Sequence, residues 1–363
     1  MTKIYLIRHA EAEGNLYRIA QGQDNSALTD RGWRQVRALE RRFADTEIDA
    51  VYASDLYRTC ATASAIYKPR GLPLHRRPEL REICVGVWER RTWGEIYRRW
   101  PEEMRLFRQQ PYSWRMEGAE TAEELVERVL RALERIAAEN EEKTVAVFCH
   151  GYAIRLALAR LQDIPPERVG ETPTGDNTAV SLLEGESGAL RVVFRDDNSH
   201  LKTAEFLAGE KVRKRANGLE PGLWYQPLKL PEQEPFFLEL AELCRPEDAP
   251  FDRDRLLVDA ETRTTLAAYR GEEPVGLLQM GPEAGQLALL CVREDCRSRG
   301  YGTQLIGQAV QRTRAQGGGT LWAAVPADSQ AGCFLTDQGF CPGGAAESRT
   351  LWEKSIRLDP EFL

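Results

Sequence analysis

The sequence predicts two α/β domains, the first built on a mostly parallel, doubly wound sheet with helices on both faces. In the first 200 residues, short apolar runs alternate with amphipathic stretches, which is the order of repeated strand–helix units. A charged, proline-rich stretch near residues 202–234 interrupts this pattern, and a second set of strands follows. A chain of 363 residues is also long for one core. We therefore expect a first domain over residues 1–205, a linker over 206–218 and a second domain over 219–363.

The elements of both domains follow from apolar spacing. In the first domain, buried runs predict strands at 4–7, 49–53 and 144–148. Helical spacing predicts helices over about 33–43, from Leu56, over 125–136 and from Tyr152. Thr121 and Glu124 form a capping-box pattern ahead of the third helix. In the second domain, strands are expected at 264–269, 275–280, 287–292 and 320–325, with a helix from Gly302.

Composition excludes several functional classes. The net charge is -7, and neither half of the chain has the basic excess typical of a nucleic-acid binder. No apolar stretch approaches the roughly 20 residues that a membrane span needs, and the N-terminus lacks the zones of a secretion signal. We expect a cytoplasmic protein without a nucleic-acid or membrane partner.

The cysteines predict neither a metal site nor a disulfide framework. None of them forms a Cys-x-x-Cys pair or a Cys/His cluster with zinc spacing. We expect buried, reduced thiols at all eight positions, which are 60, 84, 149, 244, 291, 296, 333 and 341.

Three expected strand ends of the first domain carry residues suited to phosphate chemistry. Arg8 and His9 end the first strand, Arg58 lies one helical turn beyond the second, and His150 ends a later one. Ligands gather outside the carboxyl ends of parallel strands, so these side chains are expected to converge. Imidazole is a good nucleophile near pH 7, and one guanidinium group can bind two phosphate oxygens at once. The set predicts phosphoryl transfer through a phosphorylated histidine.

Six blocks in order, across about 200 residues, carry a resemblance to the histidine phosphatase superfamily, whose fold is phosphoglycerate mutase-like. The blocks are Ile7-Arg8-His9-Ala10-Glu11 with Asn15, Leu28-Thr29-Asp30-Arg31-Gly32, Ser54-Asp55-Leu56-Tyr57-Arg58-Thr59, Leu80-Arg81-Glu82 with Gly86 and Trp88-Glu89, Gly118-Ala119-Glu120-Thr121, and Phe148-Cys149-His150-Gly151. Many members have glycine where this chain has Ala10, a small change that does not put activity in doubt. The resemblance implies that His9 is the phosphorylated nucleophile and that Arg8, Arg58 and His150 complete the phosphate pocket, with no metal required.

The resemblance also implies roles at the mouth of the pocket. Asn15 would add a hydrogen bond to the phosphoryl group, and Glu82 would donate a proton to the leaving group. Gln21 and Gly22 would help to line the mouth. The expected substrate is a small phosphorylated metabolite.

Hydrolysis of the phosphohistidine by water is favoured over return of its phosphoryl group to a retained sugar acid. Mutases of the superfamily carry a longer insertion between the positions that match Glu82 and His150. A phosphoglycerate-type mutase is the alternative. Aromatic residues in this segment could contact the leaving group or pack among themselves: Trp88, Trp93, Tyr97, Trp100, Phe107, Tyr112 and Trp114.

The second domain has a glycine-containing loop between a strand and a helix. The strand ends in Cys291-Val292, and the loop reads Arg297-Ser298-Arg299-Gly300-Tyr301-Gly302. Unpaired N–H groups at a helix N-terminus bind anions, and glycines let the backbone approach closely. The loop resembles the Arg/Gln-x-x-Gly-x-Gly/Ala motif of the GNAT family of N-acetyltransferases, as do the domain's length and its segment 333–340.

This second resemblance implies a GNAT-like fold with a mixed sheet, acetyl-CoA as cofactor and an unknown amine as acceptor. The pyrophosphate would bind at the loop, and the pantetheine arm would run beside the strand end. Many members have a tyrosine that protonates the CoA thiolate where this chain has Leu335. The alternative is therefore a regulatory module that binds acyl-CoA without catalysis. The implied cofactor residues are Cys291, Val292, Arg297, Arg299, Gly300, Tyr301 and Gly302.

Overall fold

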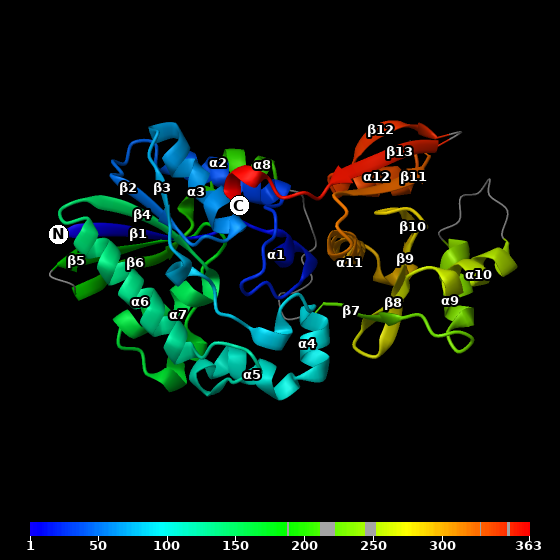
Figure 1. Ribbon diagram of the computed structural model, residues 1–363, viewed down its shortest axis with the longest axis horizontal. Helices are drawn as coiled ribbons and strands as arrows, with labels where there is room; N and C mark the ends of the chain where they lie inside the picture. Colours follow the sequence, from blue (N-terminus) through cyan, green and yellow to red (C-terminus); the bar gives the residue numbers. More distant parts are fainter. Residues whose placement is uncertain (187–188, 211–221, 244–251, 327, 347–348) are drawn as a thin grey trace.

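The computed structural model describes residues 1–186, 189–210, 222–243, 252–326, 328–346 and 349–363. It contains two α/β bodies that lie side by side (Figure 1). No helix within the described ranges is both long enough and apolar enough to cross a membrane.

A six-stranded sheet in the order β3-β2-β4-β1-β5-β6 forms the centre of the first body. Its strands are β1 (Thr2–Arg8), β2 (Ala50–Ala53), β3 (Leu74–Arg76), β4 (Thr144–Cys149), β5 (Val180–Glu186) and β6 (Ala189–Asp197). The first four are parallel, whereas β5 and β6 add an antiparallel edge. The expected mostly parallel sheet is confirmed.

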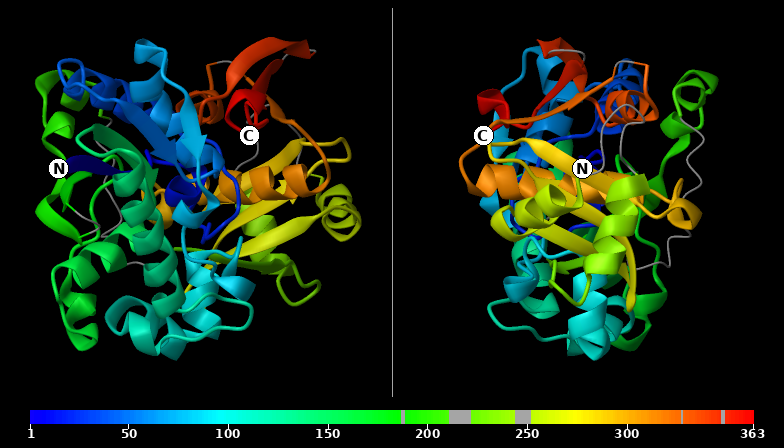
Figure 2. Two further views of the ribbon diagram at one scale, coloured as in Figure 1. Left: turned by 60° about the vertical axis from the view of Figure 1, so that its left-hand side comes forward. Right: turned by 90° about the vertical axis from the view of Figure 1, so that its right-hand side faces the viewer.

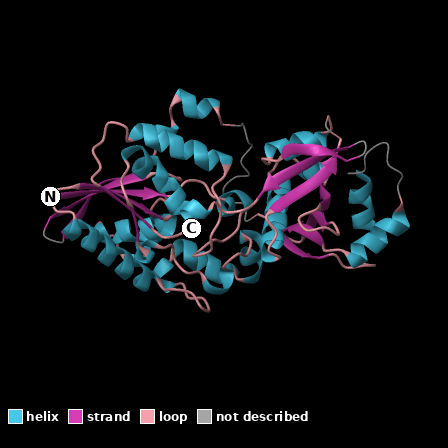
Figure 3. Ribbon diagram, turned by 45° about the horizontal axis from the view of Figure 1, so that its top comes forward, coloured by secondary structure: helices cyan, strands magenta, loops and turns pink. Residues whose placement is uncertain are grey.

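Helices cover both faces of this sheet (Figure 3). One pair is α6 (Ala122–Glu139) and α7 (Gly151–Leu161), and the other is α2 (Asp30–Arg42) and α3 (Tyr57–Arg70). Side chains alternate between the faces along β1, so Ile4 and Leu6 join the core under α6 and α7 while Ile7 joins the core under α2 and α3. Further helices are α1 (Glu13–Tyr17), α4 (Trp93–Arg99), α5 (Pro101–Gln109) and α8 (Ala204–Ala208).

The expected helices of the first domain begin within three residues of the predicted positions. Thr121 accepts a hydrogen bond from the Glu124 backbone N–H, and the Glu124 side chain accepts one in return, so the capping box is confirmed. Leu56 and His150 are the residues that precede the first turns of α3 and α7. These two starts bring Arg58 and His150 to the carboxyl end of the parallel strands.

The second body contains two small sheets, in the orders β10-β9-β8-β7 and β11-β13-β12. Helix α11 packs against the larger one (Figure 2). Within the described residues β10 and β11 share one isolated parallel bridge, from Gln286 to Trp322, so they meet at one end without forming a ladder. The strands are β7 (Trp224–Pro227), β8 (Thr265–Arg270), β9 (Glu273–Met280), β10 (Leu287–Val292), β11 (Thr320–Val325), β12 (Cys341–Ala346) and β13 (Arg349–Ser355). The helices are α9 (Glu234–Leu243), α10 (Arg253–Thr262), α11 (Tyr301–Ala315) and α12 (Gln330–Asp337).

The two bodies meet where α1 packs against α11 (Figure 1). Tyr17 belongs to the apolar core of the second body, and a Cβ added at Gly307 would lie 2.4 Å from its side chain. The Arg314 guanidinium contacts both carboxylate oxygens of Glu13, at 2.5 and 3.1 Å. Glycine at position 307 therefore lets the two helix backbones approach closely.

The C-terminus returns from the second body to the first (Figures 1 and 3). Phe362, in the short 3₁₀ helix η7 (Pro360–Phe362), is buried in the core beside α2 and α3. Its ring lies 6.0 Å from that of Trp33 and 5.7 Å from that of Tyr57. The described part of the expected linker ends at Glu210, which pairs with Arg31 and Arg34, and residues 211–218 lie outside the described ranges.

The cysteines depart in part from the expectation of buried thiols. Cys60, Cys149 and Cys296 are buried free thiols as expected, whereas Cys333 and Cys341 are exposed. Cys84 is a half-buried free thiol, Cys291 is disulfide-bonded, which corrects the expectation of a reduced thiol there, and Cys244 lies outside the described residues.

Candidate active site

The strand-end residues predicted from the sequence do converge. Strands β1 and β4 are parallel neighbours with Arg8 opposite Cys149, so His9 and His150 leave the same edge of the sheet. Their ring centroids are 5.3 Å apart. Arg58 reaches the same edge from the first turn of α3, because β2 is the other neighbour of β4.

The converging side chains are buried and leave hydrogen-bonding groups without partners. The exposed fraction is 4% for His9, 0% for His150 and 1% for Arg58. Among the described residues, the Nε atoms of Arg8 and Arg58 and both ring nitrogens of His150 have no hydrogen-bond partner. Buried polar groups are normally satisfied, so a cluster of guanidinium and imidazole nitrogen atoms without partners fits a bound oxyanion.

The orientation of His9 exposes one ring nitrogen to the pocket. Its Nδ1 lies 2.7 Å from the carbonyl oxygen of Ala10. A carbonyl only accepts, so Nδ1 carries the proton and Nε2 keeps the lone pair. Nε2 is therefore the atom that can attack an electrophile.

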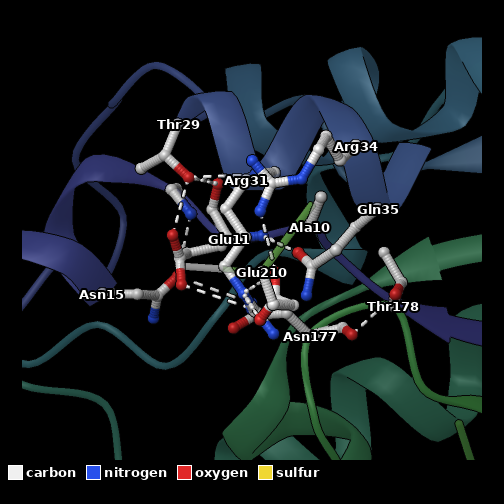
Figure 4. Close-up of polar contacts among 12 residues, drawn as sticks. Ala10, Glu11, Asn15, Thr29, Arg31, Arg34, Gln35, Asn177, Thr178 and Glu210 are labelled. Atoms are coloured by element: carbon white, nitrogen blue, oxygen red, sulfur yellow. Dashed lines mark hydrogen bonds and ion pairs between the residues drawn. The ribbon is translucent and has the colours of Figure 1, made fainter. Parts of the chain in front are cut away.

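Residues that the sequence did not single out hold the backbone around His9. The Thr62 hydroxyl accepts a hydrogen bond from Ala10 N–H at 2.9 Å, and the Gln35 side chain accepts one from Glu11 N–H at 2.7 Å. The Asn177 side chain donates to the His9 carbonyl at 2.9 Å. Figure 4 shows Gln35 and Asn177 beside Ala10 and Glu11. Each partner is far away along the chain, so no local pattern could have identified it.

The electrostatics of the pocket favour neutral imidazoles. Burial, with the charges of Arg58 and Arg8, holds the pKa of His9 well below its usual value near 6.5. Burial, Arg58 and His9 lower the pKa of His150 in the same direction. Burial lowers the pKa of Arg58 to about 10, which leaves this guanidinium charged at neutral pH. The pocket thus combines two neutral imidazoles with guanidinium cations.

The expected mouth residues Gly22 and Gln21 contact the chain rather than open space. The Gly22 carbonyl accepts a hydrogen bond from Arg58 at 2.7 Å, and the carbonyl of Asp24 accepts another at 2.9 Å. Gly22 has a φ of 44°, and a Cβ there would meet the Glu89 carboxylate. The Gln21 amide donates to the Ser26 hydroxyl. This loop therefore orients Arg58.

Asn15 and Glu82 complete the rim. Asn15 is exposed, and its side-chain oxygen accepts from Ala12 N–H at 3.0 Å, which leaves its amide N–H groups free to donate. The Glu82 carboxylate lies at the N-terminus of α7, where it accepts from the backbone of Tyr152 and Ala153, both at 3.0 Å. The Glu82 carboxylate thus lies beside the first turn of α7, the helix that begins directly after His150.

The aromatic segment between Glu82 and α6 forms mainly core. Trp88 and Trp114 are fully buried, and Phe107 is 8% exposed. Phe107 packs with its ring 4.9 Å from that of Trp114 and stacked at 4.3 Å on that of Tyr152. Of the two alternatives left open by the sequence, the structure favours packing for these three residues.

The glycine loop expected from the sequence precedes α11 in the second body. Gly300, with a φ of 81°, precedes the helix and has no side chain that could cap it. Arg297 donates to the Val292 carbonyl at 3.2 Å, and Arg299 donates to that of Asp295 at 3.4 Å. Tyr301 is buried. Backbone N–H groups would be the main donors to an anion at this loop.

Three positions that the sequence singled out pack within the second body, and they are Gly302, Leu335 and Cys291. A Cβ at Gly302 would lie 3.0 Å from the ring of Phe334, so glycine admits α12 against the start of α11. Leu335 is 5% exposed and belongs to the apolar core. Cys291 is also buried, while Val292 is half-buried at the end of β10.

Models of two known protein families match the two parts of the chain. The model for the "Histidine phosphatase superfamily (branch 1)" matches residues 4–198, and the model for the "Acetyltransferase (GNAT) family" matches residues 233–340. Within the described residues, no group of three or more His, Cys, Asp or Glu side chains is arranged to hold a metal ion.

Similar proteins match the first domain. The chain is 30% identical over 201 residues to "Phosphoserine phosphatase 1" of Hydrogenobacter thermophilus, a match of 55% of this chain and 95% of that protein. It is 30% identical over 165 residues to the "Probable phosphoglycerate mutase GpmB" of Erwinia tasmaniensis, covering 46% of this chain and 77% of that one. Among solved structures, "Bacillus stearothermophilus YhfR" is 30% identical with a TM-score of 0.54, and the match covers 55% of this chain and all of that one.

Proposed function

The chain belongs to the histidine phosphatase superfamily, and we propose that its first domain hydrolyses a small phosphomonoester through a phosphohistidine formed on His9. The observation that carries the proposal is the buried cluster of His9, His150 and two guanidinium groups with unpartnered nitrogen atoms. Such a cluster supplies a nucleophile and distributed positive charge, which are the two needs of phosphoryl transfer.

The reaction proceeds in two steps. His9 Nε2 attacks phosphorus while the bond to the ester oxygen breaks, and Glu82 gives its proton to the departing oxygen. Arg8, Arg58 and His150 stabilise the charge on the other phosphoryl oxygens, with Asn15 donating one further hydrogen bond. Water then attacks the phosphohistidine as its P–N bond breaks and returns the electron pair to His9 Nε2, Glu82 takes up the proton of the water, and inorganic phosphate leaves.

Hydrolysis rather than mutase activity is supported by the architecture of the mouth. The segment between Glu82 and His150 is shorter than the corresponding segment of superfamily mutases, and its buried aromatic residues pack against α7 instead of forming a separate cover. One similar protein is named as a phosphoserine phosphatase, and others are named as probable phosphoglycerate mutases. Because these names disagree on the phosphoester, experiment must identify it.

The test of this proposal is His9→Ala, with His75→Ala as the matched control. His75 lies on β3 and stacks on Tyr52, away from the pocket. His9→Ala should abolish release of p-nitrophenol and of inorganic phosphate from p-nitrophenyl phosphate, whereas His75→Ala should keep activity near that of wild type. Acid-labile labelling with ³²P should disappear in the His9 variant alone. Undiminished hydrolysis by His9→Ala would disprove the phosphohistidine.

For the second domain we propose that acetyl-CoA binds with its pyrophosphate at the start of α11 and that its acetyl group passes to an amine. The uncapped helix start and the separation of β10 from β11 support binding there. Arg297, Arg299, Gly300, Tyr301 and Gly302 would surround the pyrophosphate.

One observation favours the alternative of CoA binding without transfer. Leu335 is a buried hydrocarbon at the position where many GNAT enzymes have a tyrosine. Proximity alone can drive acyl transfer, so the absence of this acid does not decide between the two. Calorimetry with acetyl-CoA, followed by CoA release over a panel of amines, separates them: tight binding with no turnover would establish the alternative.

A further inference from the structure

We propose that Arg128 is a positioning residue for the proton donor Glu82, and that it acts by holding the backbone of residues 79–84. The inference rests on the proposed role of Glu82 as general acid. It concerns a residue of α6 whose side chain does not belong to the phosphate pocket.

The Arg128 guanidinium donates hydrogen bonds to the backbone of this segment and to one carboxylate. Nη1 donates to the carbonyl oxygens of Glu79 and Arg81, both at 2.8 Å, and Nη2 donates to that of Glu82 at 3.0 Å. Nε and Nη2 also donate to the two oxygens of Glu120, at 2.5 and 2.8 Å. A guanidinium has five N–H groups, and all five are used here.

Glu120 forms hydrogen bonds to the same segment at Cys84, on the C-terminal side of Glu82. Its backbone N–H donates to the Cys84 carbonyl at 3.0 Å, and its carboxylate accepts from the Cys84 N–H at 3.4 Å. The Glu120–Arg128 pair therefore bonds the chain both before and after Glu82. The two side chains are 15% and 23% exposed, so water has limited access to these bonds.

The segment needs such support because it has little regular structure. It contains the single 3₁₀ turn η1 (Pro78–Leu80), and a second one, η2 (Gly86–Trp88), follows after residues with no helix or strand. Carbonyls that a sheet or helix would satisfy are here satisfied by Arg128.

Contacts at both ends thereby fix Glu82. Helix α6 holds its backbone carbonyl through Arg128, to which the Gln23 amide adds a longer hydrogen bond at 3.2 Å. The N-terminus of α7 holds its carboxylate through Tyr152 and Ala153. Because α7 begins immediately after His150, this arrangement sets the acid relative to the phosphate pocket. A general acid must lie within hydrogen-bond reach of the leaving oxygen, so loss of the backbone restraint should reduce proton donation specifically.

The test compares two substrates that differ in leaving-group basicity but little in shape. Phenolate is a strong base that needs protonation as it leaves, whereas p-nitrophenolate needs far less help. Arg128→Lys keeps the charge but cannot reproduce the forked contacts. We expect it to lower kcat/KM about tenfold or more for phenyl phosphate and about twofold or less for p-nitrophenyl phosphate.

The matched control is Arg131→Lys. Arg131 lies on the same helix, is 73% exposed and pairs only with Glu127 among the described residues. Both substrates should be hydrolysed by this variant as by wild type. An equal loss on both substrates in Arg128→Lys would indicate general damage to the fold and would overturn the proposal, as would no loss on phenyl phosphate.

A double-substitution cycle separates this inference from its premise. Glu82→Gln alone should show the same selective loss on phenyl phosphate, and adding Arg128→Lys should cause little further loss, because both act through one proton transfer. If Glu82→Gln shows no selectivity, the proposed acid role fails and the inference fails with it. If Glu82→Gln is selective but the two losses multiply in the double variant, only the positioning role of Arg128 is disproved.

Discussion

The two candidate sites of this chain would bind anions by different means. The phosphate pocket of the first domain is assembled from imidazole and guanidinium side chains that are buried at the ends of β1 and β4 and at the start of α3. The anion site of the second domain is assembled from backbone N–H groups at the start of α11. Charged side chains can both bind and react, whereas backbone dipoles bind without titrating. The first site should therefore be sensitive to side-chain truncation and to pH, and the second to the loss of a backbone donor.

The largest expected effect comes from removing a guanidinium from the first site. Arg58→Ala should lower kcat/KM for p-nitrophenyl phosphate about 100- to 1,000-fold, because a preorganised donor to the transferred group is lost. The affinity for CoA, measured by calorimetry on the same preparation, should remain unchanged and reports that the chain is folded. Arg131→Ala, which truncates an exposed arginine, is the control. A loss of less than tenfold in Arg58→Ala would contradict the comparison.

A smaller effect is expected from removing one backbone donor at the second site. Thr303→Pro deletes an N–H group in the first turn of α11, where proline is tolerated in a helix, while Thr303→Ala deletes only the side chain. Losing one hydrogen bond to a charged group costs about 1.5–3 kcal/mol, so the Kd for CoA should rise about 10- to 100-fold in the proline variant. The alanine variant should bind CoA nearly as wild type does. Equal weakening in both variants would show that side chains, and not the backbone, form this site.

The smallest effect is a shift along the pH axis. His9 must be neutral to attack, and burial with the charges of Arg58 and Arg8 holds its pKa well below 6.5. Protonation should therefore inactivate the free enzyme only well below pH 6.5, so kcat/KM should still be near its plateau at that pH. Removing one positive charge with Arg58→Gln should raise the pKa of His9 and move the acid limb upward. The measurement is kcat/KM against pH, corrected for ionisation of the substrate.

Two outcomes of the pH experiment would contradict this account. One is a half-maximal kcat/KM near pH 6.5 in the wild type, as an unperturbed imidazole would give. The other is an acid limb that moves downward in Arg58→Gln. The affinity for CoA should vary less over the same pH range, because the amide groups at the start of α11 do not titrate.

Local patterns were sufficient to predict the framework. The run Thr144 to Phe148 and the capping box of Thr121 with Glu124 lie in the predicted strand and helix start because apolar periodicity and capping act within a few residues. The strand-end histidines His9 and His150 were also predictable, since parallel strands bring their carboxyl ends to one edge.

Contacts between residues distant along the chain were not predictable. Arg128 reads as one charged residue on the solvent side of an amphipathic helix, and nothing nearby in the sequence indicates that it binds the carbonyls of residues 79–82. Tyr17 likewise gives no sign that it packs against Gly307 of the second body. Such contacts depend on how the elements are arranged in space, and a single sequence does not encode that arrangement in its spacing.

The sequence by itself determined the two α/β folds, most of their strands and the residue types that gather at both candidate sites. Only the tertiary structure decided which backbone groups hold His9 and Glu82, that the aromatic segment forms core, that α1 belongs to the core of the second body, and that Phe362 returns to the first. The physical reason is the range of the interactions. Periodicity and capping are set by neighbours in the chain, whereas burial and side-chain hydrogen bonds are set by neighbours in space.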